Sequence, residues 1–147
     1  IGLVSAAASA AIFQILKNTE RNNDHITAVR QVQNAGYWIS RDAQMSQTLE
    51  PDGASGFPLT LSWTEWDNSE HQVIYSISDD RLRRSYSVDG GEPNQTLVAQ
   101  YTNSVAENTT CEFTGGVLTV RVTTTVGEGA HALSVTKVRE ITPRSGL

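Results

Sequence analysis

Several features that would assign a chain to a common protein class are scarce or missing in this sequence. Cysteine occurs once, at Cys111, so no internal disulfide can form, and we expect a buried, unreactive thiol. Proline is absent before Pro51, and the first 49 residues contain only two glycines, Gly2 and Gly36. We therefore expect no break in a helix over this stretch. The formal net charge of −5 argues against non-specific nucleic-acid binding, which needs a basic face, and we therefore expect no nucleic-acid partner.

Sequence motifs for catalysis, cofactors and metals are also missing. There is no nucleophile elbow, phosphate loop or dinucleotide-binding glycine run. His25, His71 and His131 are far apart and have no metal-ligand spacing. The acidic pairs 79–80 and 89–92 fall in expected turns, where aspartate is common anyway, and they lack the alternating oxygens of a calcium loop. We expect no enzyme activity, no cofactor and no metal. An enzyme using Ser, His and Asp from scattered strands would require the histidines to share a cleft.

Residues 1–49 predict one long helix with two different halves. Residues 1–16 are apolar or small on every side, whereas residues 17–49 are amphipathic. The apolar positions of the second half recur at steps of three and four residues. We expect them to cover a sheet, and they are Ile26, Val29, Val32, Gly36, Ile39 and Ala43.

The rest of the chain predicts an antiparallel β domain. Residues 50–58 form a turn-rich connection, and residues 59–147 alternate apolar and polar side chains over successive short runs separated by turns. One long helix followed by consecutive hairpins predicts an α+β fold, with the helix packed on an antiparallel sheet.

The predicted helix is too long for the domain behind it. Forty-nine residues would span roughly 70 Å at about 1.5 Å per residue, whereas a domain of about 100 residues has a radius of gyration of about 13 Å. The apolar half must therefore project, and it needs lipid or another chain as its partner. Sixteen residues fall short of the roughly 20 that cross a bilayer. With no initiator methionine, we expect that residues upstream of Ile1 supply the difference. SAAASAA also places small residues four apart, which allows close helix packing.

This order of elements resembles the type IV pilin superfamily over nearly the whole chain. The stretch IGLVSAAASAAIFQILKNTERNND is similar to the later part of the family's membrane helix, and ITAVRQVQNAGYWISRDAQMSQ to the half that lies on the sheet. The run IYSISDDRLRRSYSVDGG followed by TLVAQYTNSV is similar to J-type minor pseudopilins. The family's peptidase site and its glutamate fifth in the mature chain would lie upstream of Ile1. The C-terminal cysteine pair of many major pilins is not present.

The resemblance implies a structural subunit of a pilus-like filament or a secretion pseudopilus. Its partners would be other pilin-like subunits, with the membrane holding it before assembly. Its location would be the cell envelope, first as a single-pass membrane protein and then in a periplasmic or extracellular filament. The helix residues that would pack in the filament are Ile1, Leu3, Val4, Ala7, Ala11, Ile12, Phe13, Ile15 and Leu16. The alternative is a membrane-tethered module whose β domain binds a ligand.

A few further residues give separate expectations. Trp63 and Trp66 are an odd number apart, so one should be buried and the other exposed, and Tyr37 and Trp38 cannot both face the sheet. The cluster RLRR at 81–84 is either a subunit contact or, as we favour, a solvated turn. Asn94 and Asn108 begin glycosylation sequons in expected loops.

Overall fold

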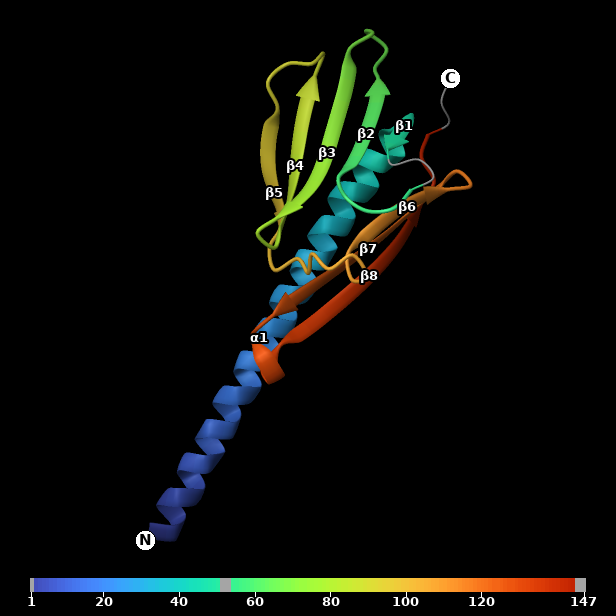
Figure 1. Cartoon of the computed structure of the whole chain (residues 1–147). Helices are drawn as coiled ribbons and strands as arrows, with labels where there is room; N and C mark the ends of the chain where they lie inside the picture. Colours follow the sequence, from blue (N-terminus) through green and yellow to red (C-terminus); the bar gives the residue numbers. More distant parts are fainter. Residues whose placement is uncertain (1, 51–53, 145–147) are drawn as a thin grey trace.

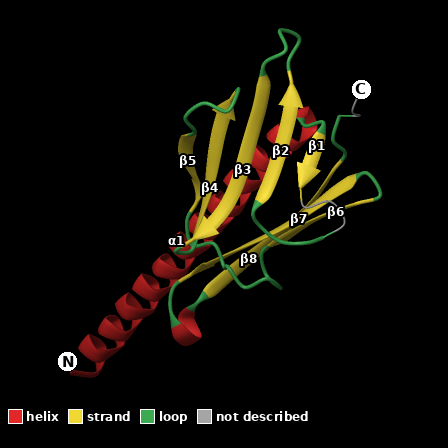
Figure 2. Ribbon diagram, turned by 45° about the horizontal axis from the view of Figure 1, so that its top comes forward, coloured by secondary structure: helices red, strands yellow, loops and turns green. Residues whose placement is uncertain are grey.

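The computed structural model of the chain describes residues 2–50 and 54–144, with only the backbone described for residues 2–7. It confirms an α+β fold in which one long helix, α1 (Gly2–Met45), packs against antiparallel sheet. The strands divide into two sheets, a division that the sequence did not predict (Figures 1 and 2).

The larger sheet has five strands in sequential order, each antiparallel to the next. Its strands are β1 (Thr48–Glu50), β2 (Leu59–Thr64), β3 (Glu70–Ser78), β4 (Arg81–Val88) and β5 (Asn94–Ala99). The smaller sheet has three, namely β6 (Thr110–Thr114), β7 (Val117–Val126) and β8 (Leu133–Ile141), with a short 3₁₀ turn η1 (Gly129–His131) before the last. Both are meanders, the simplest topology for hairpins joined by tight turns.

A single hydrophobic core joins α1 to both sheets. The helix contributes Ala35, Ile39 and Ala43, the larger sheet contributes Leu61, Val73 and Tyr75 among others, and the smaller sheet contributes Leu118, Val120 and Val122. Backbone-directed hydrogen bonds fix the helix to each sheet. Thr124 Oγ1 of β7 donates to the Ala28 carbonyl at 2.8 Å, and Asn34 Nδ2 donates to the Val98 carbonyl of β5.

The helix ends at Met45, four residues before the predicted end at Leu49. Sequence offered no breaker before Pro51, but Leu49 is buried in β1 and pairs with Leu61 of β2. Ser46 closes the helix by donating its hydroxyl to the Ala43 carbonyl at 2.7 Å. Tertiary strand pairing thus overrides the local helical preference. Residues 51–53 of the predicted connection lie outside the described residues.

The buried stripe of α1 differs from the prediction at its first member. Val32, Gly36, Ile39 and Ala43 are buried and Val29 is half-buried, but Ile26 is 49 % exposed. Ala28 is the first buried residue along the described side chains of α1, and Ile26, two residues earlier, points to the opposite side of the helix because each residue advances about 100°. Ile26 is therefore not a core residue.

Gly36 lies where α1 crosses the side chain of Arg139 from β8. A Cβ at position 36 would stand 2.5 Å from Arg139 Nε, which is buried and has no hydrogen-bond partner among the described residues. Glycine weakens a helix interior by about 0.5–1 kcal/mol relative to alanine. Here the missing side chain makes room for the arginine.

Candidate functional site

The N-terminal half of α1 extends beyond both sheets and exposes apolar side chains (Figure 1). Residues 8–23 are all exposed. Four large side chains in this stretch are each about 60 % accessible, namely Ile12 at 59 %, Phe13 at 60 %, Ile15 at 63 % and Leu16 at 62 %. From Gly2 to Thr27 the projecting part measures about 39 Å at 1.5 Å per residue.

The predicted filament-packing residues are placed only in part. Ala11 is exposed beside the four large residues. Ile1 lies outside the described residues, and the backbone of Leu3, Val4 and Ala7 is helical while their side chains lie outside the description. Over the described part of the chain, no helix combines the length and apolar character that crossing a membrane requires.

Large and small residues occupy opposite sides of this projecting segment. At about 100° per residue, Ile12, Ile15 and Leu16 fall on one side with Phe13 at its edge, while Ala10, Ala11 and Gln14 fall on the other. The large residues share the side of α1 that faces away from the sheets farther along. Such a helix can seat the bulky side of one copy against the small side of the next. A polar stretch at 17–25 separates this segment from the docked half.

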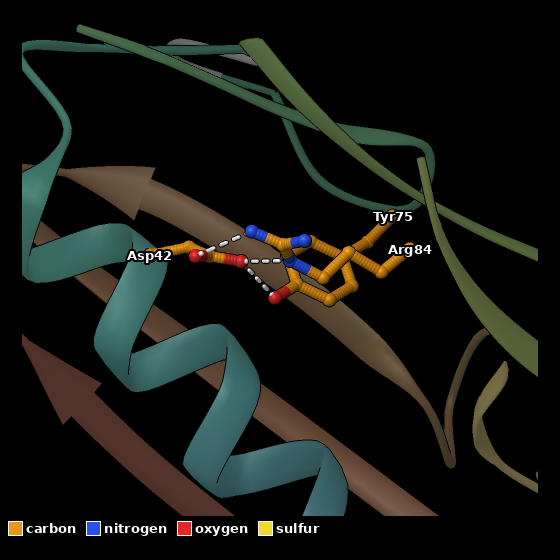
Figure 3. Close-up of polar contacts among 3 residues, drawn as sticks. All are labelled: Asp42, Tyr75 and Arg84. Atoms are coloured by element: carbon orange, nitrogen blue, oxygen red, sulfur yellow. Dashed lines mark hydrogen bonds and ion pairs between the residues drawn. The ribbon is translucent and has the colours of Figure 1, made fainter. Parts of the chain in front are cut away.

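A buried ion pair fixes the docked half of α1 to the larger sheet (Figure 3). Arg84 of β4 donates from Nε to Asp42 Oδ2 at 2.6 Å and from its terminal nitrogen to Oδ1 at 3.0 Å, and the Tyr75 hydroxyl donates to the same carboxylate. The side chains of Asp42 and Arg84 are 1 % and 12 % exposed, and Tyr75 is fully buried. Two charge-assisted bonds and one neutral donor thus satisfy the helical carboxylate.

The environment of this cluster raises the pKa values of both Tyr75 and Arg84. Burial raises the pKa of the Tyr75 hydroxyl far above its ordinary value, and the charge of Asp42 raises it further. Burial alone would lower the pKa of Arg84, but the hydrogen bond and charge of Asp42 outweigh it and raise that pKa. At neutral pH the phenol therefore stays protonated and the guanidinium stays charged, which suits a structural clamp.

The position of Arg84 corrects the expectation for RLRR. Arg81 is exposed and Arg83 donates to the Ser78 hydroxyl at 2.8 Å, as a solvated turn would allow, but Arg84 is buried against Asp42. The period of two in a strand places Arg84 on the same side as the buried Leu82. A charge on the inward side of a strand was thus a signal, visible in the sequence, of a buried partner.

An aromatic ladder continues from the ion pair across the sheet. The guanidinium of Arg84 lies 5.0 Å from the Trp38 ring and 5.1 Å from the Tyr86 ring. The rings of Trp63, His71 and Tyr86 form a nearly parallel group of three, with centroids 5.3 Å apart for Trp63 and His71, 5.8 Å for His71 and Tyr86, and 6.4 Å for Trp63 and Tyr86. Trp63 is buried, as one member of the tryptophan pair was expected to be.

His71 also joins a hydrogen-bonded row that the sequence analysis missed. Its Nδ1 lies 2.6 Å from the Tyr86 hydroxyl and its Nε2 lies 2.9 Å from Ser69 Oγ, which in turn donates to Asp67 at 2.6 Å. Serine and histidine two residues apart share one side of a strand, a spacing that could have indicated the contact. Both ring nitrogens are engaged within the sheet, so the imidazole links strands.

The remaining candidate groups lie apart from one another. His25 and His131 are exposed on α1 and η1, and no three His, Cys, Asp or Glu residues among those described are grouped to hold a metal. Cys111 is buried, donates to the Gly56 carbonyl at 3.1 Å, and has its pKa raised to about 12 by burial. Its thiol is therefore protonated and unreactive at neutral pH.

The turn acids and sequons occupy ordinary surface positions. Asp79 and Asp80 have φ of 52° and 55°, as a two-residue hairpin turn requires, and Asp89, with φ of 51°, lies in the turn that the Gly91 amide closes by donating to the Val88 carbonyl at 2.9 Å. Asn94 is exposed but opens strand β5 rather than lying in a loop, and Asn108 is half-buried in a turn.

One open hollow of about 880 Å³ lies where the two sheets approach each other. The β3–β4 turn, residues 100–105 and residues 125–128 line it. Thr102 is buried there, and its hydroxyl has no partner among the described residues.

Comparison with protein-family models, with curated proteins and with solved structures finds no match to this chain.

Proposed function

We propose that this chain is a structural subunit of a type IV pilus-like filament, assembled through the projecting half of α1. The observation that supports the proposal most strongly is the exposed apolar segment 8–16 at the end of a helix that is firmly docked elsewhere. Burying the four large side chains from about 60 % exposure would contribute on the order of 5 kcal/mol. A soluble surface rarely leaves such a patch uncovered.

The distribution of side chains favours a bundle of like helices. Segment 8–16 carries only two polar side chains, Ser9 and Gln14, and a helix that is apolar nearly all round is buried on all sides. The opposite placement of large and small residues suits parallel copies that each contact the next. In the proposed cycle the segment rests in the cell-envelope membrane and then enters the filament core, so that it meets an apolar environment in both places.

The two anchoring features give the proposed filament its rigidity. The Asp42–Arg84 pair and the hydrogen bonds from Thr124 and Asn34 hold the docked half of α1 against both sheets. A load applied along the helix would therefore pass to the β domain. The resemblance to J-type pseudopilins further predicts a place at or near the tip of a secretion pseudopilus.

The alternative is a tethered module in which α1 is only an anchor and the β domain binds a ligand in the hollow beside Thr102. Substituting leucine for Ala7 and Ala11 separates the two functions. Bulk on the small side should disrupt a tight bundle and leave membrane anchoring intact. Gln14→Leu on the same side is the control, because it raises apolar character while changing the side-chain volume little, so it tests hydrophobicity separately from bulk.

The readout is the fraction of full-length protein that sediments, together with the fraction of an Ile12→Cys reporter trapped as a disulfide-linked dimer, measured beside membrane fractionation. The proposal predicts sedimentable protein and dimers in the reporter chain, and the loss of both in the variants with leucine at positions 7 and 11. Monomers that remain in the membrane fraction for every variant would favour the tethered module.

A further inference from the structure

The side of α1 that faces away from the sheets carries an ordered, uncovered stripe of basic and apolar residues. Ile26 is 49 % and Tyr37 57 % exposed, and Arg30, Gln33 and Arg41 are exposed on the same side at helical spacing. We call these five residues the outer stripe. No Asp or Glu occurs between residues 25 and 41.

The outer stripe is held in shape by its neighbour Trp38. The Tyr37 ring meets Trp38 edge-on with centroids 6.0 Å apart, and the Arg41 guanidinium lies 5.6 Å from the Trp38 ring. Residues Arg30, Gln33 and Tyr37 border a shallow hollow. Arginine with exposed aromatic and aliphatic side chains is the composition of protein interfaces.

The turn between β2 and β3 presents the opposite character. Trp66 is 92 % exposed at its tip, and Glu65, Asp67 and Glu70 around it are exposed acids. We call these four residues the hairpin knob. The chain has no Lys or Arg between residues 42 and 80, so no basic residue of the neighbouring sequence offsets these charges.

Hydrogen bonds within the turn hold the backbone of the hairpin knob in place. Asn68 donates to the Glu65 carbonyl and the Glu65 amide donates to the Ser69 carbonyl, both at 3.0 Å. The Ser69 amide and hydroxyl donate to the Asp67 carboxylate at 3.0 and 2.6 Å. A tryptophan on a preformed turn loses little conformational entropy when it is bound.

We infer that the hairpin knob of one copy docks on the outer stripe of a second copy, an inference that rests on the proposed filament function. The negative charges of the knob complement the positive charges of Arg30 and Arg41. Trp66 of one copy contacts the exposed ring of Tyr37 of the other, beside the shallow hollow. At a net charge of −5, copies otherwise repel one another, so an acidic-to-basic contact selects one orientation.

The positions of the two surfaces allow the same contact to repeat from one copy to the next. The knob lies at the end of the molecule opposite the N-terminus, and the stripe lies along the C-terminal half of α1 (Figure 1). Different surfaces on the two partners give a heterologous contact, which extends along an axis instead of closing a dimer. A membrane is the poorer partner for the knob, because acids are repelled by anionic lipid.

The contact is small, so it acts together with the helix bundle. A tryptophan buries about 150–250 Å², well below the roughly 1,200 Å² of a stable complex. Once α1 segments pack together, the second contact becomes intramolecular and needs little affinity of its own.

Disulfide trapping in the full chain tests the inference. Thr64→Cys beside the knob and Gln33→Cys on the stripe are placed in separate chains and mixed under assembly conditions. We expect the mixed 64–33 dimer at least about 5-fold above the 64–64 dimer, which a symmetric contact would give. The wild-type chain, with only the buried Cys111, is the background, and Gln95→Cys on the outward side of β5 is the matched control.

Two further variants show whether the trapped contact uses the proposed residues. Trp66→Ala should lower the mixed dimer about 10-fold, since exposed anchors dominate such contacts. Glu70→Lys and Arg30→Glu should each lower it about 5-fold, and the two together should restore it.

Each outcome separates the inference from the proposed function. Sedimentable protein with Ile12→Cys dimers but without an excess of the 64–33 dimer would overturn the docking contact and leave the filament proposal standing. Absence of both would overturn both. A 64–33 dimer that is unchanged by Trp66→Ala would also overturn the docking contact.

Discussion

Replacing Asp42 with asparagine tests the physical account of how α1 is held to the larger sheet. The substitution keeps the shape of the side chain but removes the charge that Arg84 contacts through two hydrogen bonds. In asparagine, one of the two carboxylate oxygens is replaced by an NH₂ group, which donates hydrogen bonds and would face the N–H donors of the guanidinium. The Tyr75 hydroxyl and the guanidinium then compete for a single neutral oxygen.

The expected cost is about 3 kcal/mol in the free energy of unfolding. Removing one partner of a buried ion pair typically costs about 3–5 kcal/mol, because the other charge is left buried and unpaired. The lower end applies here, since the Arg84 side chain retains 12 % exposure and lies over the faces of Trp38 and Tyr86. Both contacts continue to stabilise the cation after Asp42 is lost.

Equilibrium urea unfolding, followed by tryptophan fluorescence, measures this cost. The informative control is the triple variant Asp42→Leu, Arg84→Met and Tyr75→Phe, which removes both charges together with the buried hydroxyl that would otherwise lose its acceptor, and fills the space. We expect it within about 1 kcal/mol of the wild type. If Asp42→Asn lost less than about 1 kcal/mol at an unchanged dependence on urea, the pair would not be the clamp described here.

Three further predictions concern individual buried and exposed residues. The raised pKa of Cys111 means that folded protein keeps a proton that unfolded protein releases, so stability should fall as pH rises from about 9 towards 12, by at most about 1.4 kcal/mol per pH unit. Cys111→Ala should flatten that slope in urea titrations at several pH values. Trp63→Ala should cost about 3–5 kcal/mol and Trp66→Ala less than about 0.5, because Trp63 is buried and Trp66 is 92 % exposed. Ile39→Ala should lower the unfolding free energy by about 2–5 kcal/mol and Ile26→Ala by under 1, and equal losses would contradict the corrected helix stripe.

Local patterns in the sequence predicted the secondary structure well where it depends on residues that are close together in the sequence. Residues 59–141 form successive antiparallel strands, as the alternation of apolar and polar side chains predicted, and one long helix opens the chain. The odd spacing of Trp63 and Trp66 placed one inside and one outside. These features depend on neighbours along the chain, which a sequence displays directly.

The features that the sequence did not predict depend on partners far along the chain. Asp42 and Arg84 are 42 residues apart, and only the packing of α1 on β4 brings them together. Leu49 leaves the helix because β2 offers it a strand partner. The exposed side of Ile26 follows from where the sheets begin to cover α1, which no periodicity within the helix can fix.

In the proposed filament, segment 8–16 of α1 drives assembly by packing against the same segment of other copies. Electron microscopy of the full chain after detergent removal, combined with the Ile12→Cys reporter, tests this proposal. We predict filaments in which Ile12→Cys chains crosslink as dimers, and no filaments when Ala7 and Ala11 carry leucine. Dispersed monomers, or particles in which Ile12→Cys crosslinks no better than Gln95→Cys, would contradict it.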